Sequence, residues 1–378
     1  MVIAVLDGGF EGVLEHPVFD SLWENDRILG TRDFVYPHDQ NVFTESGHGK
    51  SVLSTMGAYW PGHMIGTAPL ASYWLLRSEE VYSENIIEEY NWVSAAEFAD
   101  SVGADLINSS LSYRDFDISE WDHSYEEMDG NTAMATIGAD IAASKGILVC
   151  NSAGNSAGSS FPWNASPADA DSVLSIGAVD TNGDWATFSS VGPTADGRIK
   201  PAVLAMGQGT TVARGTSDIG TGNGTSFSSP IITGMTACLW QANISMKMMD
   251  IQAAIKASAS NAETPNDTLG WGIPDYMKAH TIMTDIEHQS DTEGVEVHLW
   301  PNPFDKELHI YINSEEQKDF SAELYDVSGK LLFQEEISAG NGQETELFKN
   351  KLGSVENGFY LLRINSGTIS ITRKVIKQ

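Results

Sequence analysis

The sequence predicts an α/β fold, in which a three-layer domain with helices on both faces of a parallel sheet is followed by a small all-β sandwich. Over residues 1–283, short β-branched runs alternate with helical patterns, which is typical of strand–helix–strand units. Over residues 295–378, short alternating segments are separated by Gly, Asn and Ser turns. At about 150 residues per domain, 378 residues are enough for both units.

The elements of the first domain follow one another in a regular order. Strands are predicted at 2–7, 72–77, 106–111 and 147–155, and helices at 47–58, 84–103 and 132–146. Ligands of parallel sheets bind outside the carboxyl ends of the strands. Asp7, residues 110–112 and Asn155 each close a predicted strand, so we expect them on one rim of the sheet.

Between the two domains, residues 284–294 (TDIEHQSDTEG) are polar and acidic and have neither helical nor strand periodicity. Such a stretch predicts a linker. The domain boundaries are therefore expected at 283 and 295.

Charge and composition exclude several classes of function. With 52 acidic and 21 basic residues the net charge is −31, which repels nucleic-acid phosphates and anionic membrane surfaces. No stretch approaches the about 18–20 apolar residues of a membrane span. Cys150 and Cys238 cannot form a disulfide framework, and no Cys/His spacing predicts a metal site; both cysteines lie in apolar runs, which predicts two buried thiols.

Four polar residues stand at positions suited to acyl transfer. Ser226 opens a helical pattern, so its hydroxyl and backbone N–H would lie at the positive end of a helix. His48 begins another helical pattern, while Asp7 and Asn155 follow strands. Taken singly, each has a simpler explanation, as an N-cap serine, a surface histidine, a turn aspartate and a turn asparagine.

Together, the four residues supply a complete set of catalytic groups. Acyl transfer needs a nucleophile, a base, a carboxylate that orients the base, and donors for the oxyanion. The chain order Asp, His, Ser, with Asn between His and Ser, is that of subtilisin-type enzymes rather than of chymotrypsin or α/β-hydrolases.

At these residues the sequence resembles the subtilases, the family of subtilisin-like serine proteases. The resemblance covers about residues 1–280. It is carried by eight motifs that are similar to motifs of that family, although some of their residues differ from the usual ones: VLDGGF, GHGKSV, GTAP, INSSLS, SAGN, FSSVGP, GTSFSSP and GWGIPD. It implies a subtilisin-like three-layer domain and a serine endopeptidase that acts on protein or peptide substrates. It also implies no cofactor for catalysis and no catalytic metal, and leaves room for a structural calcium ion.

The resemblance assigns roles residue by residue. Ser226 is the implied nucleophile, His48 the general base and acid, and Asp7 the orienting carboxylate; Asn155 and the Ser226 N–H form the implied oxyanion hole. Two implied substrate-binding segments are Ser110, Leu111 and Ser112, which pair with the substrate as an extra strand, and Ser152, Ala153 and Gly154, which line the specificity pocket.

Three departures from the family pattern stand near these motifs. Lys50 replaces a usual threonine beside His48, so a helix hydroxyl contact is missing. Gly8 replaces a serine or threonine after Asp7, which removes a hydrogen bond to the carboxylate. Ala202 replaces an aspartate that helps to order a turn, which we interpret as a matter of stability.

The C-terminal unit also resembles a known type of domain. WPNPFDKELHIYI, AELYDVSGKLL, NGFYLLRI and the terminal KVIKQ are similar to the C-terminal sorting domain of type IX secretion cargo. The resemblance implies that residues 295–378 engage the type IX machinery and that the protein reaches the cell surface or the medium by way of the periplasm. A generic β-sandwich binding module is the alternative.

The sequence therefore predicts a secreted serine endopeptidase. Two alternatives stay open, a catalytically inactive subtilase scaffold that binds protein at the cell surface, and a ligase in which an amine resolves the acyl-enzyme. Because Asp7 stands so near Met1, we also expect the chain to be an N-terminally incomplete form of the gene product.

One acidic segment carries a further expectation. Residues 114–130 hold seven acidic residues and a single arginine, Arg114. They form a solvated loop, or else they overhang the cleft, where they favour basic residues in substrates or bind Ca²⁺.

Overall fold

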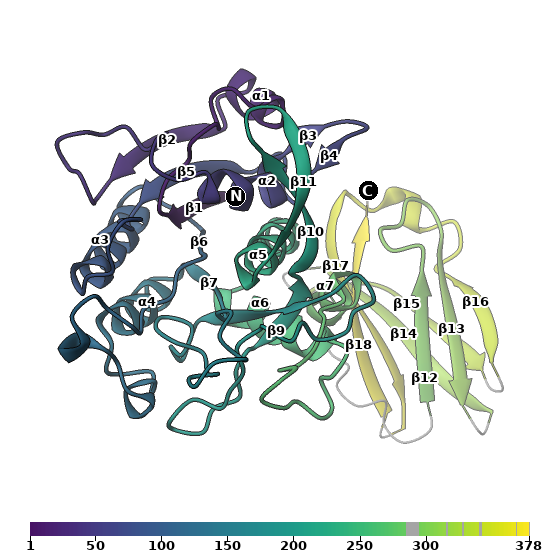
Figure 1. The fold of residues 1–378 in the computed structure, drawn as a ribbon. Coiled ribbons are helices and arrows are strands. Elements are labelled where there is room, and N and C mark those ends of the chain that lie inside the picture. Colours follow the sequence, from purple (N-terminus) through teal and green to yellow (C-terminus); the bar gives the residue numbers. More distant parts are fainter. Residues whose placement is uncertain (285–294, 315–316, 327–328, 340–341, 368, 378) are drawn as a thin grey trace. The chain divides into compact units, whose positions relative to one another are not determined.

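The computed structural model describes residues 1–284, 295–314, 317–326, 329–339, 342–367 and 369–377. The chain forms two compact units, Met1–His280 and Thr281–Gln378 (Figure 1). Of the linker expected at 284–294, all but Thr284 lies outside the described residues.

The first unit is built on a seven-stranded sheet in which every described pairing is parallel. Its order is β2-β5-β1-β6-β7-β8-β9. The strands are β1 (Val2–Asp7), β2 (Ile28–Asp33), β5 (Ser72–Arg77), β6 (Leu106–Ser109), β7 (Leu148–Ser152), β8 (Leu174–Val179) and β9 (Val203–Met206). The predicted parallel sheet is confirmed, and β2, β8 and β9 are strands that the sequence pattern did not single out.

Helices cover both faces of this sheet, which confirms the predicted three layers (Figure 1). On one face, alanines of α3 (Ile87–Ser101) and α4 (Met134–Ser144) pack with Leu6, Ile107 and Val149 of the sheet, because small side chains allow helix and sheet to approach closely. On the other face lie α2 (His48–Gly57) and α5 (Thr225–Ala242). The remaining helices are α1 (Asp20–Glu24), α6 (Met248–Ser258) and α7 (Tyr276–Thr284), with 3₁₀ turns at Pro17–Phe19, Ser119–Trp121 and Tyr125–Glu127.

Two antiparallel hairpins project from the first unit. One pairs β3 (Tyr59–Trp60) with β4 (Met64–Ile65), and the other pairs β10 (Gln208–Arg214) with β11 (Asp218–Asn223). Because β11 ends directly before α5, the second hairpin leads the chain to Ser226.

The second unit is an antiparallel sandwich, as predicted. One sheet has the order β12-β13-β16 and the other the order β15-β14-β17-β18. The strands are β12 (Val295–Trp300), β13 (Leu308–Ser314), β14 (Lys318–Asp326), β15 (Leu331–Ala339), β16 (Gln343–Leu347), β17 (Gly358–Ser366) and β18 (Ile369–Lys377), with a 3₁₀ turn at Leu352–Ser354. Ile310, Phe320, Leu324, Leu362 and Val375 are among the alternating residues that fill its core.

The expectation of two buried thiols is wrong for one cysteine. Cys150 is buried on β7, whereas Cys238 is exposed on α5. An apolar run on a helix still has one face that the sheet does not cover, so the run alone did not reveal the exposure of Cys238.

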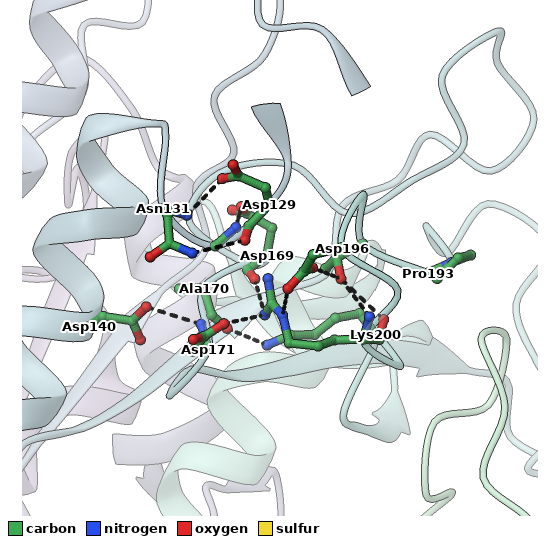
Figure 2. A network of polar contacts seen from close by, with 12 residues as sticks. Asp129, Asn131, Asp140, Asp169, Ala170, Asp171, Pro193, Asp196 and Lys200 are labelled. Atoms are coloured by element: carbon green, nitrogen blue, oxygen red, sulfur yellow. Dashed lines mark hydrogen bonds and ion pairs between the residues drawn. The ribbon is translucent and has the colours of Figure 1, made fainter. Parts of the chain in front are cut away.

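A polar network, buried at Lys200 and partly exposed at Arg198, joins the loop before β9 to the segment before β8 (Figure 2). The Lys200 Nζ donates to the carbonyl oxygens of Ala170 at 2.7 Å and Val173 at 2.9 Å. Nearby, Arg198 pairs with Asp171 at 3.0 Å and Asp196 at 2.7 Å. Burial lowers the pKa of Lys200 from 10.5 to about 7, because two carbonyl oxygens do not replace the hydration of a full charge.

The titration of Lys200 predicts a pH-dependent part of stability. Between about pH 7 and pH 10.5 the unfolded chain binds the proton that the folded chain has lost, so the free energy of unfolding rises with pH there. Lys200→Met removes this part. We expect urea unfolding at several pH values to show that the free energy of unfolding of the wild type, minus that of K200M, increases with pH across this interval. A difference that is independent of pH would contradict the assignment.

Candidate active site

The Asp7 carboxylate and the His48 imidazole form a hydrogen-bonded pair. Asp7 ends β1 and is buried, while His48 is the first residue of α2. The His48 Nδ1 lies 2.9 Å from both carboxylate oxygens. Because a carboxylate accepts only, Nδ1 carries the hydrogen and Nε2 is left as the basic nitrogen. The Asp7 charge raises the pKa of His48 above its usual 6.5.

A close approach of two glycines brings this pair together. The Gly49 N–H donates to the Gly9 carbonyl at 3.1 Å. A Cβ on Gly49 would lie 2.4 Å from the same oxygen, so no other residue fits there without moving the helix. The start of α2 can therefore pack directly against the turn that follows β1.

Ser226 lies in the first turn of α5. Its carbonyl accepts a hydrogen bond from the Ser110 Oγ at 3.1 Å. The N-cap residue, Gly224, has no side chain to cap the helix, so the Ser226 N–H keeps the free donor capacity of a helix N-terminus. No hydrogen bond joins the Ser226 hydroxyl to His48 within residues 1–284; in unliganded enzymes, hydrogen bonds between a base and the group it acts on are often long and shorten when substrate binds. The His48 ring stands 6.0 Å from that of Phe227, between centroids.

Asn155 is fixed to the helix that carries Ser226. Its Oδ1 accepts from the Thr225 N–H at 2.9 Å and from the Thr225 Oγ1 at 3.1 Å. Since Oδ1 must face these donors, Nδ2 is the end of the amide that is left to donate, and it has no partner in the described part of the chain. The structure thus places a free amide donor beside the first turn of α5.

A cavity of about 440 Å³ opens beside Ser226 and Asn155. Of the residues expected to bind substrate, Ser110, Ser112, Ser152 and Gly154 line it. Leu111 and Ala153 do not: both are buried, Leu111 among the apolar residues beneath α3 and α4, and the Ala153 N–H donates to the Ile176 carbonyl at 2.8 Å. Neither Asp7 nor His48 is part of this wall.

The sequence analysis missed several residues of the cavity wall. They are Glu84, Ser156, Ser159, Phe161, Trp163, Ala165 and Ser190. Arg114 and Asp115 of the acidic segment also line it, with the Arg114 guanidinium 4.4 Å from the Phe161 ring centre. Part of the acidic segment therefore lies at the cavity, in agreement with the expectation that it overhangs the cleft. Its effect on substrate choice stays a prediction.

The three departures from the family pattern have structural counterparts. The Lys50 Nζ donates to the Gly215 carbonyl between β10 and β11, and burial lowers its pKa. The Gly8 N–H donates to the Asp7 Oδ1 at 2.8 Å, so the carboxylate keeps a main-chain donor. The Ala202 N–H donates to the Ser175 carbonyl at 2.8 Å.

Metal binding has no support from side-chain clusters. Within the described ranges, no group of three or more His, Cys, Asp or Glu side chains is placed to hold a metal ion. Structural calcium stays a prediction.

Comparisons with known proteins concern the family and the fold of the chain. The Subtilase family model matches residues 1–272. Subtilisin NAT of Bacillus subtilis subsp. natto is 30% identical over 243 residues, which are 63% of this chain and 54% of that protein. Serine protease AprX of Bacillus subtilis (strain 168) is 29% identical over 288 residues, or 68% of this chain and 60% of that protein. The chain thus spans little more than half the length of these two relatives.

The self-cleaved protease domain of PatA has the same fold. Its structure gives a TM-score of 0.59 at 22% identity and covers 75% of this chain and 96% of its own. At that identity the likeness concerns the fold alone.

The C-terminal unit and the family membership follow from the same comparisons. Residues 298–378 match the model of the secretion system C-terminal sorting domain. In the part of the chain that the structure describes, no helix combines the length and the apolar character of a membrane span. Because the family model covers well over half of the sequence, the chain belongs to the subtilase family.

Proposed function

We propose that the protein is a secreted serine endopeptidase in which Ser226, His48 and Asp7 form the catalytic triad. The observation that carries this proposal is the Asp7–His48 hydrogen-bonded pair, at 2.9 Å, together with a helix N-terminus that presents Ser226 beside the amide of Asn155. A nucleophile, a base, an orienting carboxylate and oxyanion donors are then all available.

The reaction follows from these roles. The Ser226 Oγ attacks the peptide carbonyl while the His48 Nε2 takes its proton, and the Asp7 carboxylate stabilises the imidazolium. The oxyanion accepts hydrogen bonds from the Asn155 Nδ2 and the Ser226 N–H. His48 then protonates the leaving amine, and an acyl-enzyme remains. Water, activated by His48, hydrolyses this ester and releases the second product.

Substrate binds as an extended segment in this proposal. Residues 110–112 follow β6 at the carboxyl rim, and an extended peptide can pair with their main chain whatever its sequence. Ser152 and Gly154 line the opposite side, with the buried Ala153 between them. The cavity between the two segments accepts one substrate side chain, with Phe161 and Trp163 as apolar contacts.

Two alternatives to this proposal are an inactive binding scaffold and a ligase. An inactive binding scaffold needs neither the oriented His48 nor the free Asn155 amide, and both are present. A ligase would transfer the acyl group to an amine, and mass spectrometry of the products separates joining from hydrolysis.

The triad predicts the effects of three substitutions. Ser226→Ala and His48→Ala should abolish labelling by a fluorophosphonate and most peptide hydrolysis, because the attacking oxygen or its base is lost. Asn155→Ala should lower kcat by about 10²–10³, a figure measured on subtilisin itself, with little change in KM. Wild-type proteolysis by the Ser226→Ala variant would show that another residue is the nucleophile.

The charge of Arg214 predicts a shift in the pH profile. Neutral His48 is the active form, so kcat/KM rises with pH through the pKa of His48. The exposed Arg214 guanidinium lowers this pKa, against the larger raising effect of Asp7. Arg214→Ala should therefore move the acidic limb of the profile to higher pH.

A matched control for this shift is Lys145→Ala, at the end of α4, because Lys145 is not among the charges that act on His48. Its acidic limb should stay where that of the wild type lies. An unmoved limb in Arg214→Ala would mean that the limb reports a group other than His48.

We further propose export through the type IX machinery, with residues 295–378 as the sorting signal and the periplasm as the route. The match of residues 298–378 to a secretion-system sorting domain supports this proposal. The protein then acts outside the cell or at its surface.

Deletion of residues 295–378 should trap the protein in the periplasm. The peptidase unit has its own core, so the retained protein should still hydrolyse peptides. Immunoblots of periplasm and medium measure this, with full-length Ser226→Ala as the control that loses activity but keeps export. Normal release of the truncated form would identify the C-terminal unit as a binding module.

A further inference from the structure

The turn that presents Asn155 is held by a second segment of the chain, residues 188–190. The Ser190 N–H donates to the Gly154 carbonyl at 2.9 Å, and the Ser156 N–H donates to the Ser190 Oγ at 3.0 Å. One further turn contact runs from the Ala157 N–H to the Phe188 carbonyl at 3.1 Å. The residues on both sides of Asn155 are thus bonded to Ser190.

The contact between the turn and Ser190 is tight. Ser190 is fully buried, and it is also one of the residues that line the cavity. Gly154 has φ 101°, and a Cβ on it would lie 2.8 Å from the Ser190 Oγ. Gly154 is therefore required both by its left-handed backbone and by the hydroxyl packed against it.

The Asn155 side chain has a separate anchor. Its Oδ1 is bound by Thr225, and the Thr225 Oγ1 also accepts from the Gly154 N–H at 3.1 Å. Thr225 fixes the amide end, whereas Ser190 fixes the main chain from which the side chain projects. Both constraints are needed to determine where Nδ2 points.

We propose that Ser190 is a positioning residue for the oxyanion site, whose hydroxyl holds the turn 154–156 so that the Asn155 Nδ2 faces the developing oxyanion. The proposal rests on the proposed function, in which that amide is a donor. Ser190 touches no reacting atom in this account and acts only through Asn155. Small displacements matter, because an oxyanion donor contributes only at hydrogen-bond distance from the position the charge will occupy.

The neighbouring serine supplies a matched control. Ser189 is as fully buried as Ser190, and its Oγ likewise accepts one main-chain N–H, that of Ala178 at 3.0 Å. Ala178 lies on β8 and is not part of the turn 154–156. Ser189→Ala and Ser190→Ala therefore remove the same kind of hydrogen bond, and only the second loosens the turn that carries Asn155.

The test is a double-mutant cycle on the full chain. Ser190→Ala should lower kcat about tenfold, with KM nearly unchanged, and slow fluorophosphonate labelling in parallel. Ser189→Ala should keep kcat within about twofold at a similar loss of melting temperature. In the Asn155→Ala background, Ser190→Ala should have no further effect on kcat, because its target amide is gone.

Several outcomes decide against the proposal. Equal kcat for Ser190→Ala and Ser189→Ala, or a tenfold loss that persists in the Asn155→Ala background, would assign Ser190 a structural role only. Should Ser190→Ala fold poorly, Ser190→Cys tests the same hydrogen bond, since a thiol is a much weaker acceptor than a hydroxyl; it too should lose its effect on kcat without Asn155. Absence of labelling in the wild type would instead overturn the proposed function itself.

Discussion

The parallel arrangement of the central sheet determines where the candidate site lies. β1, β6 and β7 are neighbours and run in the same direction, so the residues that follow them meet at one rim. Asp7, residues 110–112 and the turn with Asn155 come from segments far apart in sequence, and no local interaction would gather them. The pairing register of three adjacent strands does so, because it sets where each strand stops relative to the next.

The second constraint is the position of α5 against the sheet, which buried polar groups specify. The Asn108 Oδ1 on β6 accepts from the Ser229 Oγ at 3.1 Å and the Thr233 Oγ1 at 2.9 Å. The Ser110 Oγ donates to the Ser226 carbonyl at 3.1 Å. Apolar packing alone would tolerate a small slide of the helix, whereas unmaking these buried bonds is costly. The distance between Ser226 and residues 110–112 is fixed by that network.

Sequence patterns predicted the parts of the fold that have a strong local signal. VIAVLD and ILVCNS are continuous apolar runs, as expected of strands buried on both faces, and β1 and β7 lie there. ILGTRD forms the edge strand β2, in which most residues are exposed or half-buried without alternation and one is a glycine, so its local pattern was weak. The four motif residues could be named because each stands in a short, ordered motif. The acidic segment with Arg114 and the motif FSSVGP with Ser190 stand out in the sequence, but neither shows which of its residues reaches the cavity, and Glu84 has no such signal. Ser189 and Ser190 are adjacent, identical and equally buried, yet they bind different elements.

Two buried lysines of the peptidase unit donate to main-chain carbonyl oxygens. Lys200 binds Ala170 and Val173, and Lys50 binds Gly215, in a chain with a net charge of −31. Burial lowers the pKa of both lysines, because carbonyl partners do not replace the hydration of a full charge. Lys50 shows the use of this arrangement. It stands two residues after His48 and donates to the Gly215 carbonyl, so it ties the helix that begins at His48 to the turn of the β10–β11 hairpin, whose second strand leads into Ser226.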